Sequence, residues 1–146
     1  MYRRLALIAA LLSVSLGAAN AETVAQTFEK FGMIGTWAEN CKAPASDSNL
    51  YQEYSILPSG LVARRFFNGP RANFEYNVLS AEVSGDQITL DVRNLEPPYR
   101  GYGIVMIKRG DKIRLWESAN EYGHSQVLDG AAVDTRVATS WLSRCR

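Results

Sequence analysis

The sequence predicts an all-β protein: an antiparallel up-and-down barrel of about eight strands with one short helix before it, or alternatively a β-sandwich. From residue 34 onward, apolar and polar residues alternate with the period of two that is typical of half-buried strands. Gly, Pro, Asn and Asp residues interrupt these runs at intervals of about 8 to 12 residues, as in an antiparallel meander. A helical period occurs only before the first run.

An export signal precedes the predicted domain. Met1–Arg4 is positively charged, an apolar run extends from Leu5 to about Leu16, and Ala19-Asn20-Ala21 supplies the small residues at which signal peptidase cleaves. The apolar run is about 12 residues long, whereas a membrane-spanning helix needs roughly 20. We therefore expect residues 1–21 to be a signal peptide and residues 22–146 to be a single β-barrel domain. The expected location is the periplasm of a Gram-negative bacterium or the medium outside it.

The charge of the chain argues against several classes of partner. The 16 basic residues include two arginines of the expected signal, so 14 remain against 15 acidic residues, a net charge near −1. Binding of nucleic acid or of an anionic membrane surface calls for a basic excess. We expect a monomer that binds no nucleic acid and has no membrane span in the mature chain.

The two cysteines, Cys41 and Cys145, are predicted to form one disulfide, as expected for a pair in an exported protein. This bond would close a loop of roughly 100 residues, which contributes about 4.7 kcal/mol in the chain-entropy model. A redox-active or metal-binding pair would need Cys-x-x-Cys spacing or nearby histidines, and the sequence has neither.

The first element of the mature chain is a predicted helix over Glu22–Met33. Val24, Phe28 and Phe31 recur at helical spacing, and Gly32 is a typical helix end. Such a helix in a small β protein covers one open end of a barrel or sandwich.

The strands follow in order. In the first half they are Ile34–Glu39, Leu50–Leu57, Leu61–Phe67 and Phe74–Val78, separated by a polar loop at 41–49 and by turns at 58–60 and 68–70. In the second half they are Ile88–Arg93, Tyr102–Lys108, Ile113–Glu117, Gln126–Leu128 and Val133–Leu142. The connections between them are Gly85-Asp86, Glu96-Pro97-Pro98, Gly110-Asp111, the polar segment 118–124 and Asp129-Gly130.

Gly35-Thr36-Trp37, which follows the helix and opens the meander, resembles the first-strand motif of the lipocalin and wider calycin family. The resemblance implies that an arginine from a late strand packs over the Trp37 ring, and Arg114 or Arg144 would be that residue. It also implies a disulfide between the C-terminal tail and the barrel. Bacterial barrel-shaped inhibitors of secreted metalloproteases look similar at this level.

Residues that would indicate catalysis or a metal site are scattered. His124 is the one histidine, and Glu121, Asp129 and Asp134 are isolated oxygen donors, so we expect no metal and no cofactor. The sequence has no nucleophile elbow and no phosphate-binding loop. Acids that alternate with apolar residues on strands are typical of a solvated face, so no catalytic pair is expected from the following set: Glu53, Glu75, Asp91 and Glu96. We expect a non-enzyme.

Arg64-Arg65-Phe66-Phe67 places an arginine and an aromatic residue on each face of one strand. If Arg64 and Phe66 point inward, they suit an apolar ligand with a carboxylate or other anionic group, which Arg64 would bind in a bidentate way. In the interpretation that we prefer from sequence, an inward Arg64 simply pairs with Glu53 or Glu75.

Pro97-Pro98-Tyr99-Arg100-Gly101-Tyr102 forms a second candidate cluster. Tyrosine and arginine are enriched at binding hot spots, so Tyr99 and Arg100 could face a protein partner. The same tyrosines could instead close one barrel end. Two functions therefore remain: binding of a small apolar or anionic ligand in a cavity lined by aromatic residues, or a protein-interaction module such as a periplasmic protease inhibitor or envelope assembly factor. The expected cavity residues are Arg64, Tyr54, Phe66, Tyr76 and Tyr102.

Overall fold

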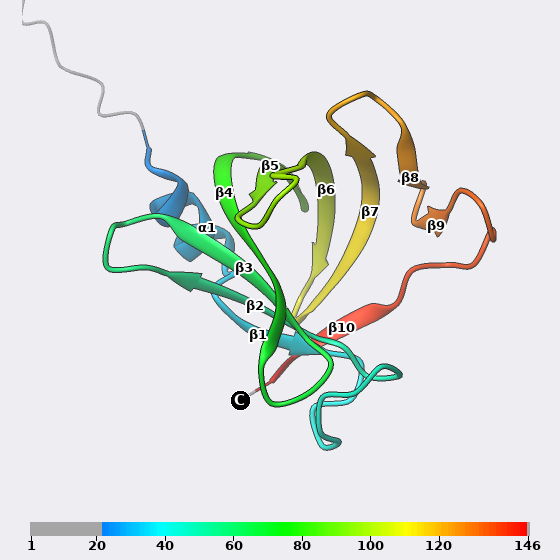
Figure 1. The fold of residues 1–146 in the computed structure, drawn as a ribbon. Coiled ribbons are helices and arrows are strands. Elements are labelled where there is room, and N and C mark those ends of the chain that lie inside the picture. Colours follow the sequence, from blue (N-terminus) through cyan, green and yellow to red (C-terminus); the bar gives the residue numbers. More distant parts are fainter. Residues whose placement is uncertain (1–21, 146) are drawn as a thin grey trace, which may run out of the picture.

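Antiparallel pairing closes the meander into a barrel in the computed structural model, which describes residues 22–145 (Figure 1). One helix, α1 (Val24–Phe31), precedes ten strands. The strands are β1 (Gly35–Ala38), β2 (Tyr51–Ile56), β3 (Val62–Phe67), β4 (Ala72–Ser84), β5 (Gln87–Asn94), β6 (Gly101–Arg109), β7 (Lys112–Asn120), β8 (Ser125–Leu128), β9 (Ala131–Ala132) and β10 (Trp141–Cys145).

The last strand decides between barrel and sandwich. Strands β1 to β7 pair in sequence order, and β10 pairs antiparallel with both β1 and β7. Eight strands therefore form a closed ring, which confirms the predicted barrel and removes the sandwich alternative. β8 and β9 stand beside β7 outside this ring, on the opposite side of Figure 1 from α1.

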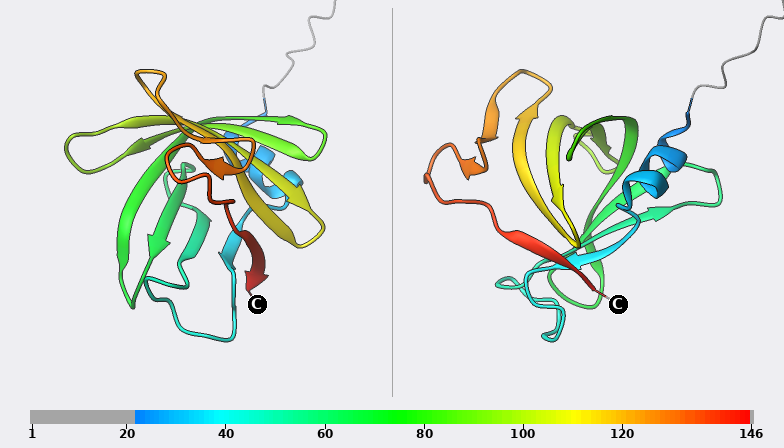
Figure 2. Two further views of the ribbon diagram at one scale, coloured as in Figure 1. Left: turned by 90° about the vertical axis from the view of Figure 1, so that its right-hand side faces the viewer. Right: turned by 180° about the vertical axis from the view of Figure 1, so that it is seen from behind.

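Helix α1 covers one end of the barrel (Figures 1 and 2). Thr23 caps its start in a reciprocal arrangement with Gln26, and Gly32 caps its end. The Phe28 side chain is fully buried, and its ring centroid lies 5.2 Å from that of Tyr54 inside the barrel. The predicted position of the helix is thus confirmed, although its regular part is shorter than residues 22–33.

The core follows the inward positions of the strands. In β5, Ile88, Leu90 and Val92 are buried while the intervening side chains are exposed, as the alternating pattern predicts. Fully buried residues at the covered end include Trp37, Met33 and Tyr54. This end of the barrel is filled by side chains.

Three predicted boundaries need correction. The strand predicted to end at Val78 runs on to Ser84, because a register shift between Val78 and Ser80 lets the pairing with β5 continue. β7 extends to Asn120, through residues 118–120 that were expected to be a connection.

The third correction concerns Val133–Leu142, which is not one strand. Residues 133–140 form turns in which Val137 is exposed, and the strand begins only at Trp141. The Asp134 side chain accepts a hydrogen bond from the Thr135 N–H, and the Arg136 backbone has a φ of +60°. These local turns override the strand propensity of the two valines.

Candidate functional site

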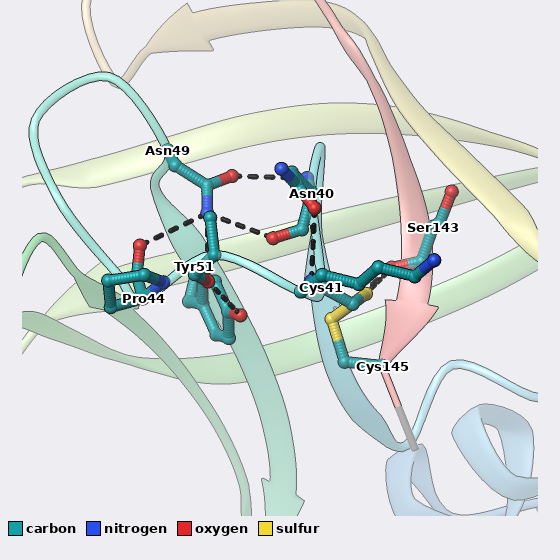
Figure 3. The surroundings of a disulfide bond; sticks show 9 residues. Asn40, Cys41, Pro44, Asn49, Tyr51, Ser143 and Cys145 are labelled. Atoms are coloured by element: carbon teal, nitrogen blue, oxygen red, sulfur yellow. Dashed lines mark hydrogen bonds between the residues drawn. A yellow bond between two sulfur atoms is a disulfide. The ribbon is translucent and has the colours of Figure 1, made fainter.

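The Cys41–Cys145 disulfide is present as predicted, with its Cα atoms 5.2 Å apart. It ties the end of β10 to the loop of residues 39–50 that leads from β1 to β2 (Figure 3). Within this loop the buried Asn49 side chain donates to the carbonyls of Asn40, Ala43 and Pro44 and accepts from the Asn40 N–H. The disulfide and the Asn49 hydrogen bonds therefore hold both ends of this loop in place beside the open end of the barrel.

Arg144 is the arginine that lies over Trp37, with its Cζ atom 5.6 Å from the ring centroid. The two residues are register partners on β10 and β1, and the Trp37 indole donates to the Met33 carbonyl at 2.9 Å. The Arg144 guanidinium also donates to the Ile34 carbonyl. A Cβ atom at position 35 would lie 3.3 Å from Arg144 Nε, so Gly35 leaves room for this arginine.

Arg114, the other candidate for the Trp37 contact, belongs to a different cluster. Its guanidinium lies 5.8 Å from the Trp116 ring centroid and 5.7 Å from that of Trp141. It donates to the Gly130 carbonyl at 2.6 Å and to Thr139 Oγ1 at 3.0 Å. Through these hydrogen bonds Arg114, which belongs to β7, holds the turn between β8 and β9 and the segment before β10 against the barrel.

Two adjoining cavities open at the end of the barrel opposite α1. The larger has a volume of about 350 Å³ and the smaller about 300 Å³, and Leu50 and Phe66 line both. These volumes fall at the lower limit of small-molecule sites, which span roughly 300–1,000 Å³. The larger cavity is lined by apolar Leu50, Phe66, Met106, Leu115 and Leu142, polar Ser48, Gln52, Thr139 and Ser140, and charged Glu39, Asp47 and Arg64.

Arg64 points into the barrel and is only 6% exposed. Its Nη2 atom donates to Gln52 Oε1 at 3.3 Å, and its Cζ atom lies 4.6 Å from the centroid of the Phe66 ring. Its Nε atom is buried without a hydrogen-bond partner, and no carboxylate within residues 22–145 lies within 4.0 Å of the guanidinium. A buried cation in this state is unusual, because charges in protein interiors are ordinarily paired.

The carboxylates expected to neutralise Arg64 bind its neighbour instead. Glu53 and Glu75 are the register partners of Arg65, so all three side chains share the outer face of the sheet. Arg65 donates to Glu75 Oε2 at 2.7 Å and to Glu53 Oε1 at 3.2 Å. The pairing that we preferred from sequence is therefore wrong, since side chains one residue apart point to opposite faces of a strand.

Gln52 connects Arg64 to the filled end of the barrel. Its Nε2 atom donates to the Tyr54 hydroxyl at 2.7 Å. Burial raises the pKa of Tyr54, and the nearby Arg64 charge offsets part of that increase. Tyr54 is not among the residues that line the two cavities, contrary to our expectation, because it is fully buried in the filled end, in contact with Phe28 and Gln52.

The other predicted aromatic residues form a row beside Arg64. The Phe66 and Tyr76 rings meet edge to face at 6.1 Å, as do the rings of Tyr76 and Tyr102. Phe66 and Tyr76 line the smaller cavity, whereas Tyr102, which we also expected there, lines neither cavity. Burial raises the pKa of Tyr76, and the nearby Arg64 charge offsets part of that increase.

Tyr99 and Arg100 lie outside the cavities, in the connection between β5 and β6. Tyr99 is 57% exposed, and Arg100 is also exposed. Neither side chain contacts Arg64. The structure thus separates the predicted binding residues into a cavity group and a loop group.

The acidic residues and His124 do not come together into a metal site within residues 22–145. Within residues 22–145, no cluster of three or more His, Cys, Asp or Glu side chains could hold a metal ion. His124 lies in an exposed turn, where its backbone pairs with Asn120. Asp91 accepts a hydrogen bond from Ser80, on the outer face of the barrel.

Comparisons with protein-family models, with curated proteins and with solved structures found no match for this chain. Its barrel is compatible with a lipocalin-like architecture. Over the part of the chain that the structure describes, no helix is long and apolar enough to cross a bilayer.

The sequence analysis did not identify Gln52, Glu39 or Asp47 as cavity residues. Gln52 could have been found, because it shares its strand face with Tyr54, two residues away. Glu39 begins the loop of residues 39–50 and Asp47 lies within it, so their position over the cavity depends on how that loop folds back.

Proposed function

We propose that this protein binds a small molecule with an anionic group and an apolar portion in the open end of its barrel. The observation that carries the proposal is Arg64, a buried guanidinium without a carboxylate partner among residues 22–145, in the wall of a largely apolar cavity. A ligand carboxylate would supply the missing negative charge. Charge-assisted hydrogen bonds to arginine are among the strongest in proteins, and its fork of donors matches a carboxylate.

The cavity supports the apolar part of the proposal. Its walls come from Phe66, Met106, Leu115 and Leu142. Burying each methylene group of a ligand contributes about 0.8 kcal/mol, so a short aliphatic or aromatic chain would add substantially to the charged contact. The Phe66 and Tyr76 rings, which pack edge to face, form part of the wall of the adjoining smaller cavity.

The proposal is tested by calorimetric titration of the purified, oxidised chain with octanoate and, in parallel, with the neutral octanol. We expect octanoate to bind more tightly than octanol to the wild type. In Arg64→Met the preference should disappear, with at least a tenfold loss of octanoate affinity, corresponding to the roughly 1.5–3 kcal/mol of a hydrogen bond to a charged group. Octanoate binding that does not depend on Arg64, or no binding of either probe, would refute the proposal.

A matched control is available on the same strand. Arg65→Met removes an arginine from the outer face and leaves the cavity unchanged. It should retain the affinity for octanoate, so a loss in both variants would indicate a general charge effect or a disturbed fold.

A second candidate function is recognition of a protein partner through the β5–β6 connection. It is favoured by the 57% exposure of Tyr99 and by the neighbouring Tyr122, which is 76% exposed in the turn after β7. Capture from a periplasmic extract with the wild type and with a Tyr99→Ala/Arg100→Ala variant tests it. A partner retained by the wild type alone would support this function, and a partner retained equally by both would contradict it.

We further propose that the protein is an exported, non-enzymatic relative of lipocalin-like barrels. Support comes from the barrel itself, from the Gly35–Trp37–Arg144 arrangement and from the disulfide. The signal expected at residues 1–21 lies outside the described residues. The mass of the protein after bacterial export tests that expectation, since cleavage before Glu22 gives one defined product.

A further inference from the structure

We infer that the ligand is bipolar, with its anionic group at Arg64, an apolar middle, and a cationic ammonium group at the rim of the cavity. This inference rests on the proposed function and goes beyond it by naming the chemistry of the second ligand end. It follows from the positions of the charges that line the larger cavity. Those charges are Arg64, Glu39 and Asp47.

The two carboxylates lie on the outer part of the cavity. Glu39 directly follows β1, Asp47 belongs to the loop of residues 39–50, and both side chains are exposed, whereas Arg64 is 6% exposed. The Asp47 carboxylate accepts a hydrogen bond from Asn68 Nδ2 at 2.6 Å, which fixes it next to the connection between β3 and β4. The cavity thus has a positive floor and a negative rim.

Within the described residues, the opposite charges of the cavity do not form ion pairs with one another. The ion pairs found within residues 22–145 join Lys30 to Glu22 and Arg65 to Glu53 and Glu75, and none involves the charged residues of the cavity. The apolar side chains of Phe66, Met106, Leu115 and Leu142 contribute the rest of the wall. A ligand with opposite charges at its two ends can satisfy both regions at once.

This arrangement discriminates between anions. The carboxylate of a simple fatty acid gains the contact with Arg64, while its tail gains nothing from the rim. The second carboxylate of a dianion would be repelled by Glu39 and Asp47. An ammonium group at the same position would be attracted, so an ω-amino acid or a short apolar peptide with both termini free has the matching chemistry.

The test is a titration of the oxidised chain with octanoate, ω-aminooctanoate and the dianion suberate, which share an eight-carbon chain. At low salt, ω-aminooctanoate should bind roughly two- to fivefold more tightly than octanoate, the range given by exposed ion pairs. Suberate should bind more weakly than octanoate by a similar factor. These preferences should diminish at high salt, because exposed charges are screened.

The variant Glu39→Gln/Asp47→Asn should bind the three probes with nearly equal affinity while keeping its affinity for octanoate. Glu82→Gln, which removes an exposed carboxylate from β4, is the matched control and should keep the wild-type order. Equal binding of octanoate and ω-aminooctanoate to the wild type, or an unchanged preference in the double variant, would overturn the bipolar inference and leave the proposed function intact. Failure of all three probes to bind would overturn both.

Discussion

Replacing Arg64 by methionine should stabilise the ligand-free protein while it removes binding of the anion. A buried ion without a counter-ion carries a desolvation cost of several kcal/mol. Within the described residues, Arg64 recovers part of that cost through one hydrogen bond to Gln52 and through contacts with the rings of Phe66 and Tyr54. Methionine has a similar length, fills irregular apolar space and carries no charge.

The magnitude follows from these opposing contributions. The hydrogen bond to Gln52 is long, at 3.3 Å, so its contribution lies near the lower limit of about 1.5 kcal/mol for a charged group. The contacts of the guanidinium with the rings of Phe66 at 4.6 Å and Tyr54 at 5.9 Å together add about 1–2 kcal/mol. Against a desolvation cost of several kcal/mol, we expect Arg64→Met to raise the free energy of unfolding by about 1 kcal/mol.

Urea denaturation of the wild type, Arg64→Met and Arg65→Met measures the effect. Arg65 is bonded to Glu53, Glu75 and Ser55, so its replacement should lower the free energy of unfolding by about 1 kcal/mol. If the free energy of unfolding rises in Arg64→Met and falls in Arg65→Met, Arg64 is retained at the expense of stability, as binding groups often are. A loss of stability in Arg64→Met equal to that in Arg65→Met would refute the reasoning, because Arg64 would then be an ordinary structural arginine.

Three further predictions concern the framework of the site. Replacing Cys41 and Cys145 by serine opens a link across 104 residues and should lower the free energy of unfolding by about 2–5 kcal/mol, measured in urea; a change near zero would contradict the loop-entropy account. Gly130→Ala should cost about 1–3 kcal/mol more than Gly85→Ala. Both glycines have positive φ, but only at position 130 would a Cβ atom lie 2.9 Å from Trp116 and Arg114. Equal decreases in the melting temperatures of the two variants would therefore disprove the contact. Because burial raises the pKa of Tyr54, the neutral phenol is favoured by folding; stability should be unaffected by this group below pH 10 and fall by about 1.4 kcal/mol per pH unit above it. Tyr54→Phe should reduce that alkaline loss, and an unchanged slope would show that Tyr54 titrates normally.

The barrel could be predicted because its signals are local. Ile88, Leu90 and Val92 alternate with polar residues along β5, and the Gly85-Asp86 and Gly110-Asp111 turns fix where neighbouring strands reverse. The disulfide was predictable for a similar reason, since the two cysteines had no alternative partner among the cysteines of the chain.

Closure of the barrel and the bounds of its last strand were harder to predict from the sequence. The pairing of β10 with β7 joins segments far apart in sequence, and no local pattern encodes it. The turns at residues 133–140 depend on hydrogen bonds from the Ala132 and Thr139 N–H groups to the Val137 and Gly130 carbonyls. Strand propensity, which takes no account of these hydrogen bonds, wrongly predicted a strand over residues 133–140.

The open end of the barrel can be understood by following the inward positions of neighbouring strands from the helix outward. On β2 and the residue before it, Tyr54 is fully buried, Gln52 is 5% exposed and Leu50 is 49% exposed. On β3 the same direction leads from buried Val62 through Arg64 to the half-buried Phe66. The register pairs Gln52 with Phe66 and Arg64 with Tyr54, so the two polar residues are diagonal neighbours and form one polar level between the filled end and the open end. A barrel selected only for stability would continue the apolar packing through that level, so the presence of Gln52 and Arg64 there argues for a polar group that enters from the open end.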